Sequence, residues 1–310
     1  MAQIVSIFDN EYVKRNSLKA WLLAARPKTL TGAAVPVMIG IAYAWHLMGT
    51  MSAAQIIPAV LCMAFAFVMQ IDANFINDYY DCLKGRDTEE RLGPLRACQQ
   101  GWVSMRAMRI AIIITSILAC IIGLPLIFYG GYELIIVGVL CLLFCFLYTT
   151  CLAQMGLGDL LVIAFFGIVP CVFTTYVVVP TAFQYYTLMP WNLGVATGLV
   201  IDCLLIVNNY RDIENDRTSG KRTLVVLIGK KYTEYLYLTL VPVAIIMIMV
   251  QFGYSNVNLL LGFAIYFVHI GTGNKMRRIG EGKALNQVLG ETARNILIYG
   301  VLTSLLIILQ

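Results

Sequence analysis

Two polar segments of the sequence place oxygen-bearing side chains at matching intervals. The first motif reads NDYYDCLKGRDT at 77–88 and the second reads NNYRDIENDRTSGK at 208–221, and in both an asparagine precedes an aspartate by four positions. A separation of four residues places two side chains on the same face of a helix. Carboxylate and amide oxygens are the ligands that hard cations such as Mg²⁺ prefer. The two motifs therefore predict a site for a divalent cation.

Each motif continues its polar stripe beyond one pair. The stripes consist of Asn77, Asp78 and Asp81 in the first motif and of Asn208, Asp212 and Asp216 in the second. Gly85 stands where the first motif would match Asp216, so we expect Asp87 to reach the site only if the chain turns after Gly85. Like charges one helical turn apart repel each other, which indicates that a cation lies between the stripes. We expect Glu89 and Glu90 to be solvated.

The apolar composition of the chain indicates that membrane-spanning helices position these motifs. Of the 310 residues, 60% are hydrophobic and 13% are charged, whereas a soluble domain has about 45–50% and about 25%. A mean hydropathy of +0.79 requires many bilayer-length segments, and it excludes a disordered chain and argues against a soluble enzyme. We predict nine membrane-spanning helices, from apolar runs at 29–48, 53–76, 107–128, 132–152, 160–180, 190–207, 235–252, 257–271 and 293–309. Bends that open a central cavity are expected at Pro36, Pro58, Pro125, Pro170 and Pro242.

All 22 lysines and arginines fall on one predicted side of the membrane. They group at 14–28, 84–109, 211–231 and 275–294, while the turns at 49–52, 129–131, 181–189 and 253–256 contain none. Because basic loops face the cytoplasm, we predict a cytoplasmic N-terminus and an external C-terminus. The net charge of +5 then reflects topology, and no nucleic-acid partner is expected.

Several of these bases lie in the same loops as the acidic motifs. A metal site alone does not need them, whereas a diphosphate does, because guanidinium and ammonium groups bind phosphate oxygens. The combination predicts a Mg²⁺–diphosphate site at the membrane surface with an apolar cavity behind it. A polyprenyl diphosphate has both the charged part and the apolar part that such a site requires.

Other residue types exclude alternative sites. The chain has two histidines, His46 and His269, which are too few for a multi-histidine zinc or haem site. Nine cysteines lie mostly inside apolar runs without CxxC spacing, so we expect reduced thiols that fill the core. The mixed, charged residues at the start of the chain do not predict a cleaved secretory signal.

The sequence resembles the UbiA superfamily of intramembrane aromatic prenyltransferases. The motifs that carry this resemblance are RPKTL at 26–30, NDYYDCLKGRD at 77–87, RLGPLR at 91–96, GLGD at 156–159 and NNYRDIENDRTSGKRTLVVLIG at 208–229. The segments KGRD, GPLR and NNYRDIENDR point within the superfamily to the naphthoate branch. Beyond the sixth apolar run, the resemblance rests on hydropathy alone.

The resemblance implies an all-α polytopic membrane protein in which nine transmembrane helices surround a central cavity. It implies one domain, 1–310, of two similar helical halves whose motif helices end near 81 and 212. The implied metal ligands are Asn77, Asp78, Asp81, Asp87, Asn208, Asp212 and Asp216, of which Asp78, Asp81, Asp212 and Asp216 are the expected catalytic residues. The bases expected to bind diphosphate, unless they only set topology, are Lys28, Arg91, Arg96 and Lys221.

The implied reaction is Mg²⁺-dependent transfer of a polyprenyl group from its diphosphate to 1,4-dihydroxy-2-naphthoate. Loss of CO₂ would give demethylmenaquinone, at the inner membrane of a bacterium, as a step of menaquinone biosynthesis. Candidates to face the allylic cation are Tyr79, Tyr80, Tyr148 and Tyr210, although tyrosines also anchor helices at interfaces. The segment TTCLAQMGLGD lacks a base that relatives often carry, which leaves fewer candidate diphosphate contacts.

Some alternatives remain open at this stage. The acceptor could be another aromatic acid such as 4-hydroxybenzoate, because no residue identified here reads the ring. A membrane transporter would also place acids inside a helical bundle, but near the bilayer midplane rather than at one interface. Asp72 and Asp202 lie deeper in the second and sixth runs, where a carboxyl is either functional or neutral and hydrogen-bonded.

Overall fold

The computed structural model describes residues 13–85 and 92–310, and every regular element in these residues is a helix. The α-helices are α1 (Leu18–Ala25), α2 (Leu30–Met48), α3 (Ala53–Leu83), α4 (Met105–Gly123), α5 (Ile127–Gly130), α6 (Glu133–Thr150), α7 (Gly158–Val162), α8 (Val169–Val178), α9 (Trp191–Arg211), α10 (Ile213–Thr218), α11 (Leu224–Phe252), α12 (Asn256–Ile279) and α13 (Leu285–Ile308). Short 3₁₀ turns are η1 (Pro27–Thr29), η2 (Leu124–Leu126), η3 (Leu152–Met155), η5 (Thr181–Phe183) and η6 (Tyr186–Leu188), and η4 (Ile163–Ile168) is π-helical.

The predicted number of membrane spans is confirmed over the described residues. Nine helical segments are long and apolar enough to cross a bilayer, and three of them join shorter pieces: Leu18–Met48, Met105–Gly130 and Gly158–Val178. The helices exceed the apolar runs, because α3 continues to Leu83 and α9 continues to Arg211. Asn77, Asp78, Asp81 and Asn208 therefore lie near the ends of membrane helices.

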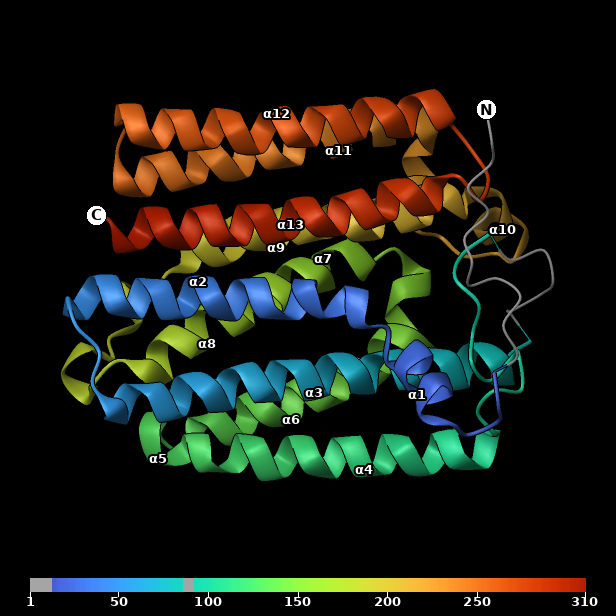
Figure 1. Cartoon of the computed structure of the whole chain (residues 1–310), viewed down its shortest axis with the longest axis horizontal. Helices are drawn as coiled ribbons and strands as arrows, with labels where there is room; N and C mark the ends of the chain where they lie inside the picture. The colour runs from blue at the N-terminus through green and yellow to red at the C-terminus, as the bar shows by residue number, and fades with distance from the viewer. Residues whose placement is uncertain (1–12, 86–91) are drawn as a thin grey trace.

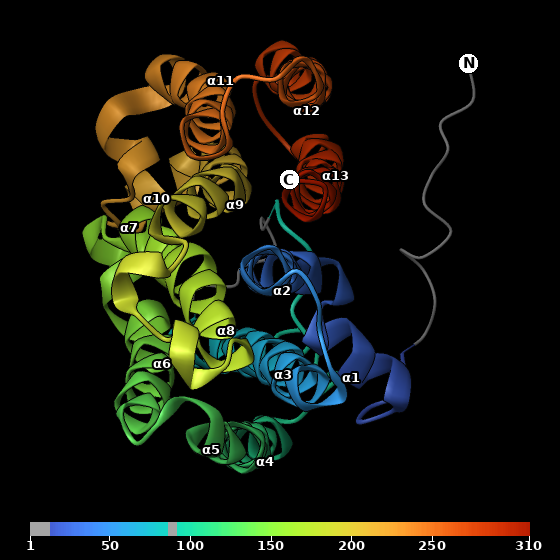
Figure 2. The same cartoon turned by 90° about the vertical axis from the view of Figure 1, so that its left-hand side faces the viewer.

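The helices form a bundle in which successive spans reverse direction (Figure 1). The ends of α3 and α9, the short α10 and the bend after α1 gather at one end of the bundle, and the chain terminates at Gln310 at the opposite end. The end-on view shows α9, α11, α12 and α13 on one side and α3, α4, α5 and α6 on the other, with α2 and α8 between them (Figure 2). This topology brings the two motifs to the same end.

Two of the predicted proline bends coincide with departures from α-helical geometry. Pro125 lies in η2, which separates α4 from α5, and Pro170 follows the π-helical η4 at the start of α8. Proline removes a backbone donor and clashes with the preceding turn, so the helix must change its pitch there. A π-helical turn widens the helix and redirects the side chains on it.

Glycines bring η4 and α9 into backbone contact. A Cβ placed on Gly167 would lie 2.5 Å from the Cα of Gly198, and one on Gly198 would lie 2.7 Å from the Cα of Ile163. No larger residue fits at either position without moving a backbone. The contact fixes the register of these two antiparallel segments, beside the largest hydrophobic core, which α9 builds with α2, α11 and α13.

Candidate active site

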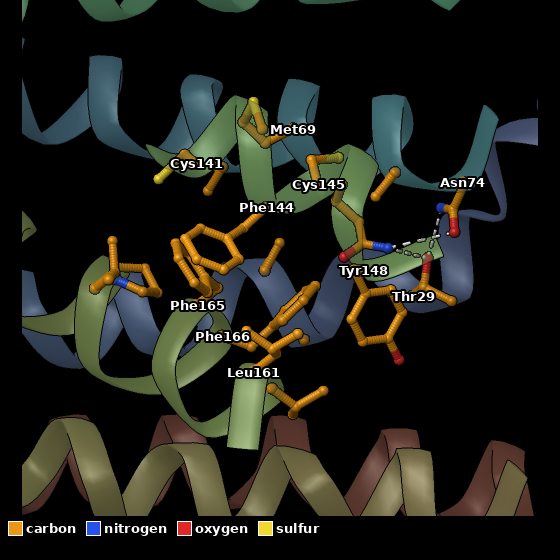
Figure 3. Close-up of a pocket in the computed structure, with 18 of the residues that line it drawn as sticks. Thr29, Met69, Asn74, Cys141, Phe144, Cys145, Tyr148, Leu161, Phe165 and Phe166 are labelled. Carbon is orange, nitrogen blue, oxygen red and sulfur yellow. Dashed lines mark hydrogen bonds between the residues drawn. The ribbon is translucent and has the colours of Figure 1, made fainter. Parts of the chain in front are cut away.

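A cavity of about 630 Å³ lies among α2, α3, α6, α9 and the segment from α7 to α8. Its polar end holds motif residues from α3, α9 and α10, namely Asn77, Asp81, Asn208, Asp212 and Asp216. Behind them the lining is apolar and aromatic, and Figure 3 shows Phe144, Phe165, Phe166 and Tyr148 gathered in one part of it. The predicted arrangement of a charged end and an apolar interior around a central cavity is confirmed.

The first motif presents two of its three polar residues to the cavity. Asn77 and Asp81 lie one turn apart on α3, and both line the cavity. The Thr149 hydroxyl donates to Oδ1 of Asn77 at 2.9 Å, and the Arg96 guanidinium donates to Oδ2 of Asp81 at 2.9 Å. Both side chains are therefore held by groups from other elements.

Asp78 does not face the cavity. It is 1% exposed, and its carboxylate accepts the backbone N–H groups of Ala97 at 2.9 Å and of Cys98 at 3.0 Å. The reason is helical geometry, since a residue next to Asn77 projects about 100° away from it around the helix. This differs from the expected role of Asp78 as a catalytic residue and metal ligand. As placed, Asp78 anchors the loop that carries Arg96.

The second motif presents all three of its polar residues to the cavity. Helix α9 ends at Arg211, Asp212 occupies the junction, and α10 starts at Ile213. Asn208, Asp212 and Asp216 all line the cavity, across from the residues of the first motif. The interrupted helix lets the acids follow the cavity wall.

Arg211 is a site residue that the sequence analysis did not single out. It is 3% exposed and donates to both carboxylate oxygens of Asp212, at 2.9 and 2.6 Å. It also donates to Oδ1 of Asn208 at 2.7 Å and to Oδ1 of Asn286 at 2.8 Å. The only signal in the sequence is a base directly before Asp212, which is indistinguishable there from a topology-setting charge.

The bases predicted to bind diphosphate are distributed unequally. Arg96 and Lys221 line the cavity, and Lys221 donates to Oδ1 of Asp216 at 2.8 Å. Lys28 is exposed and is not part of the lining, whereas Arg26, two residues earlier, is. The two side chains diverge because Lys28 lies in the 3₁₀ turn η1 and Arg26 precedes it in a left-handed conformation, φ 50°. Arg91 and Asp87, with Glu89 and Glu90, lie outside the described residues.

One of the four candidate tyrosines lines the cavity. Tyr148 does so from the last turn of α6 (Figure 3). Tyr79 and Tyr80 contact each other edge to face and pack against the cluster that holds α1 to α3 and α4. Tyr210 is buried and donates to Oε1 of Glu234 at 2.9 Å. Tyr148 is thus the one placed to contact a bound cation through its ring.

The two acids at membrane depth have different surroundings. Asp72 accepts the hydroxyls of Thr115 at 2.5 Å and Ser116 at 2.8 Å, so it joins α3 to α4 as a hydrogen-bonded carboxyl. Asp202 is 3% exposed, and its Oδ1 has no hydrogen-bond partner. The same is true of Oδ1 of Asp159, in the GLGD segment, whose residue is 8% exposed.

The charges at the polar end balance each other locally. Burial raises the pKa of the Asp216 carboxyl, and the Lys221 ammonium 2.8 Å away opposes that rise. Asp81 is paired with Arg96, and Asp212 with Arg211. Each of these three motif carboxylates therefore has a basic partner that a cation or a phosphate group can exchange with.

The donor set fits a hard divalent cation that is shared with a phosphate ligand. Within residues 13–85 and 92–310, no three acidic, histidine or cysteine side chains converge as a complete metal cage. Mg²⁺ is commonly bound through one or two carboxylates, with phosphate and water oxygens completing its octahedron. Asp81 with Asn77 on one wall, and Asp212 and Asp216 with Asn208 on the other, supply oxygens of this kind.

The family model for the UbiA prenyltransferase family matches residues 33–297. The chain belongs to this family. A curated relative from Escherichia coli (strain K12), named 1,4-dihydroxy-2-naphthoate octaprenyltransferase, is 36% identical over 226 residues, which cover 68% of this chain and 69% of the relative. A relative of the same name from Mycobacterium tuberculosis is 34% identical and covers 74% of this chain and 76% of its own length.

Solved structures of UbiA homologues share the fold. An apo homologue from Aeropyrum pernix K1 superimposes with a TM-score of 0.66 at 17% identity, covering 89% of this chain and 98% of that one. A homologue from Archaeoglobus fulgidus, bound to DMAPP and Mg²⁺, gives a TM-score of 0.63 at 15% identity, covering 93% and 99%. The family and fold predicted from the motifs are confirmed.

Proposed function

We propose that this protein transfers a polyprenyl group from its diphosphate to 1,4-dihydroxy-2-naphthoate, releasing diphosphate and CO₂ and forming demethylmenaquinol, the reduced form of demethylmenaquinone. The observation that carries the proposal is one cavity with oxygen-rich motifs at its end and aromatic walls behind them. The acceptor follows the name shared by the bacterial relatives. Supporting the choice of an enzyme over a transporter, the cavity-facing motif acids lie at one end of the bundle.

The diphosphate and its metal are proposed to bind between the two motifs. Asp81, Asp212 and Asp216 would hold Mg²⁺ with the amide oxygens of Asn77 and Asn208. Bound Mg²⁺ supplies Lewis-acid neutralisation of the charge that grows on the departing diphosphate. Asp78 enters this proposal as a positioning residue, because its carboxylate holds the loop of Arg96.

The cavity bases are proposed to bind the phosphate oxygens. Arg96 and Lys221 each pair with a motif carboxylate, and each would exchange it for a phosphate oxygen as the metal takes over the carboxylate. Charge-assisted hydrogen bonds of this kind favour the leaving diphosphate over the bound ester, so the allylic C–O bond ionises more readily. Arg211 keeps Asp212 and Asn208 oriented toward the cavity.

The apolar part of the cavity is proposed to hold the allylic cation and the acceptor ring. Phe144 and Phe165 lie with ring centroids 4.9 Å apart, and Tyr148 lines the wall nearer the motifs (Figure 3). Aromatic faces stabilise a cation and exclude water that would quench it. The electron-rich ring then attacks the allylic carbon.

The long tail is proposed to leave the cavity sideways. Leu124, Ile135 and Val139 line the cavity and are 55%, 44% and 57% exposed. The proposed exit is the lipid-facing surface beside α4 and α6, where a polyprenyl chain would enter the bilayer. We place the protein in the cytoplasmic membrane of a bacterium, with the motif end and N-terminus cytoplasmic and the C-terminus outside.

The test is a direct comparison of acceptors with purified protein in lipid. We expect octaprenyl transfer to 1,4-dihydroxy-2-naphthoate and little to 4-hydroxybenzoate, with loss of activity in EDTA and recovery with Mg²⁺. Asp212→Ala and Asp81→Ala should remove transfer, whereas Glu214→Gln, in the same motif but outside the cavity lining, should not. Faster transfer to 4-hydroxybenzoate would overturn the acceptor, and an active Asp212→Ala protein would overturn the site.

A further inference from the structure

Two buried carboxyls face each other across the contact between α7 and α9. Gly167 meets Gly194, and Ile163 meets Gly198, four residues further along each antiparallel segment. The next step in this register places Asp159 opposite Asp202. The carboxyl of Asp202 is within electrostatic range of that of Asp159, and Gly158 contacts Leu205 on the next turn of α9.

One oxygen of each carboxyl in the Asp159–Asp202 pair lacks the partner that a buried carboxyl oxygen normally has. Oδ1 of each residue is buried without a hydrogen bond, whereas both oxygens of Asp72 accept hydroxyls. An isolated charge is costly in such surroundings, and two like charges more so. A proton held by one of the two carboxyls removes one of these charges.

The pair lies on the route between the motifs and the aromatic wall. Asp159 lines the cavity, whereas Asp202 is buried and is not among the lining residues. Tyr148 and Phe165 line the same cavity as Asp159, and the Tyr148 phenol is within electrostatic range of Asp159 and Asp202. An acceptor ring bound in this cavity would have Asp159 in its wall.

We propose that Asp159 is a catalytic residue that takes and returns the proton of the acceptor hydroxyl, with Asp202 as the positioning residue that shares it. This rests on the proposed function. Neither the position of Asp159 in the cavity wall nor its opposition to Asp202 is required by the metal–diphosphate site, which the two motifs supply without them.

The Asp159–Asp202 pair can accept the proton that the acceptor loses and return it later in the same reaction, so the protons balance. As the ring carbon that bears the carboxylate bonds to the allylic carbon, the neighbouring ring C–OH becomes C=O and its proton passes to Asp159. The product of that step is a β-keto acid. Its C–CO₂ bond then breaks, the electron pair returns to the ring, and the ring oxygen regains the proton from Asp159. Neither an oxidant nor a net proton is required.

Separating ionisation from acceptor chemistry tests the proposal. Prenyl diphosphate labelled with ¹⁸O at the bridging oxygen reports C–O cleavage by migration of the label to non-bridging positions. We expect Asp159→Asn to slow formation of the naphthoate product about 10²-fold or more, the size of a general-base contribution, while label migration persists. Asp202→Asn should show a smaller loss of the same kind, and Asp159→Glu should recover part of the rate.

Two controls make the outcome decisive. Asp72→Asn changes a carboxyl of the same span depth that has its own hydroxyl partners, and both readouts should stay near wild type. With acceptors whose ring hydroxyl is made more acidic by a halogen, the ratio of wild-type to Asp159→Asn rates should shrink. Equal loss of migration and transfer, or a constant ratio across acceptors, would overturn the role. Failure of the wild-type protein to prenylate naphthoate would instead overturn the proposed function.

Discussion

The two motifs have the same spacing but are built differently. In the first, α3 continues without a break to Leu83, so Asp78 turns away from the cavity and accepts backbone N–H groups. In the second, the helix is interrupted at Asp212, and Asp216 on α10 still faces the cavity. A repeated sequence pattern therefore does not produce two equivalent sets of ligands.

The basic partners of the motifs differ in the same way. Arg96, which pairs with Asp81, comes from the loop after α3, and Asp78 holds that loop. Arg211 and Lys221, which pair with Asp212 and Asp216, come from the second motif itself. The second motif therefore contains the basic partners of its own carboxylates, whereas the first motif takes its basic partner from the loop that follows α3.

The largest expected effect falls on the second motif. Asp216→Asn removes a buried, cavity-facing carboxylate, and we expect single-turnover transfer to fall roughly 10³-fold, the upper range for removal of one electrostatic stabiliser. Product formation in lipid nanodiscs measures it. Glu214→Gln, two residues away and exposed, is the matched control. Similar rates for the two variants would place the second motif outside the chemistry.

Removal of Arg211 should damage stability as well as activity. Arg211→Met leaves the Asp212 carboxylate without its partner and Asn286 without a donor, and breaking a buried ion pair costs about 3–5 kcal/mol. A lowered melting temperature of the detergent-solubilised protein, partly restored in Arg211→Lys, is the expected result. Unchanged melting would mean that the motif is held by its backbone alone.

Asp78→Asn should have an intermediate effect on transfer, because it weakens the support of Arg96 rather than removing a cavity-facing carboxylate. The amide keeps one acceptor for the two N–H groups of residues 97 and 98, so one hydrogen bond to a charged group is lost, worth about 1.5–3 kcal/mol. Because Arg96 loses its support, kcat/KM for prenyl diphosphate should fall about tenfold, equivalent to about 1.4 kcal/mol. A collapse of kcat as deep as that of Asp216→Asn would return Asp78 to the metal site predicted from sequence.

Lys28→Gln should have the smallest effect. The residue is exposed and lies off the cavity, so steady-state transfer should be unchanged within error, whereas Lys221→Gln should lower kcat/KM for prenyl diphosphate. If the two variants behave alike, the bases act through the general positive potential of that membrane face rather than through contacts.

The span count, the fold and the meeting of the motifs at one end could be predicted, because hydropathy and charge bias act along the sequence. The orientation of the Asp78 side chain could not be predicted. Spacing alone does not show whether a carboxylate binds a cation or accepts hydrogen bonds from the backbone N–H groups of a later loop. Arg211 could not be identified as a site residue, because in the sequence it is indistinguishable from the basic residues that set membrane topology. The backbone contact between Gly167 of η4 and Gly198 of α9 joins two different membrane spans, and no local sequence pattern predicts it.

The cavity wall built by α4 and α6 buries far fewer side chains inside the protein than the wall built by α9. Helix α6 buries only Thr149, and α4 buries Met108, Ile112 and Ala119, whereas α9 buries fourteen residues. Helices with so few buried residues present most of their side chains to the cavity or to lipid. We therefore expect annular lipids to complete this wall, beside which the tail is proposed to leave. Acyl-chain length and detergent exchange consequently act on the reaction chamber itself, and a nanodisc of defined lipid is the appropriate setting for every rate comparison above.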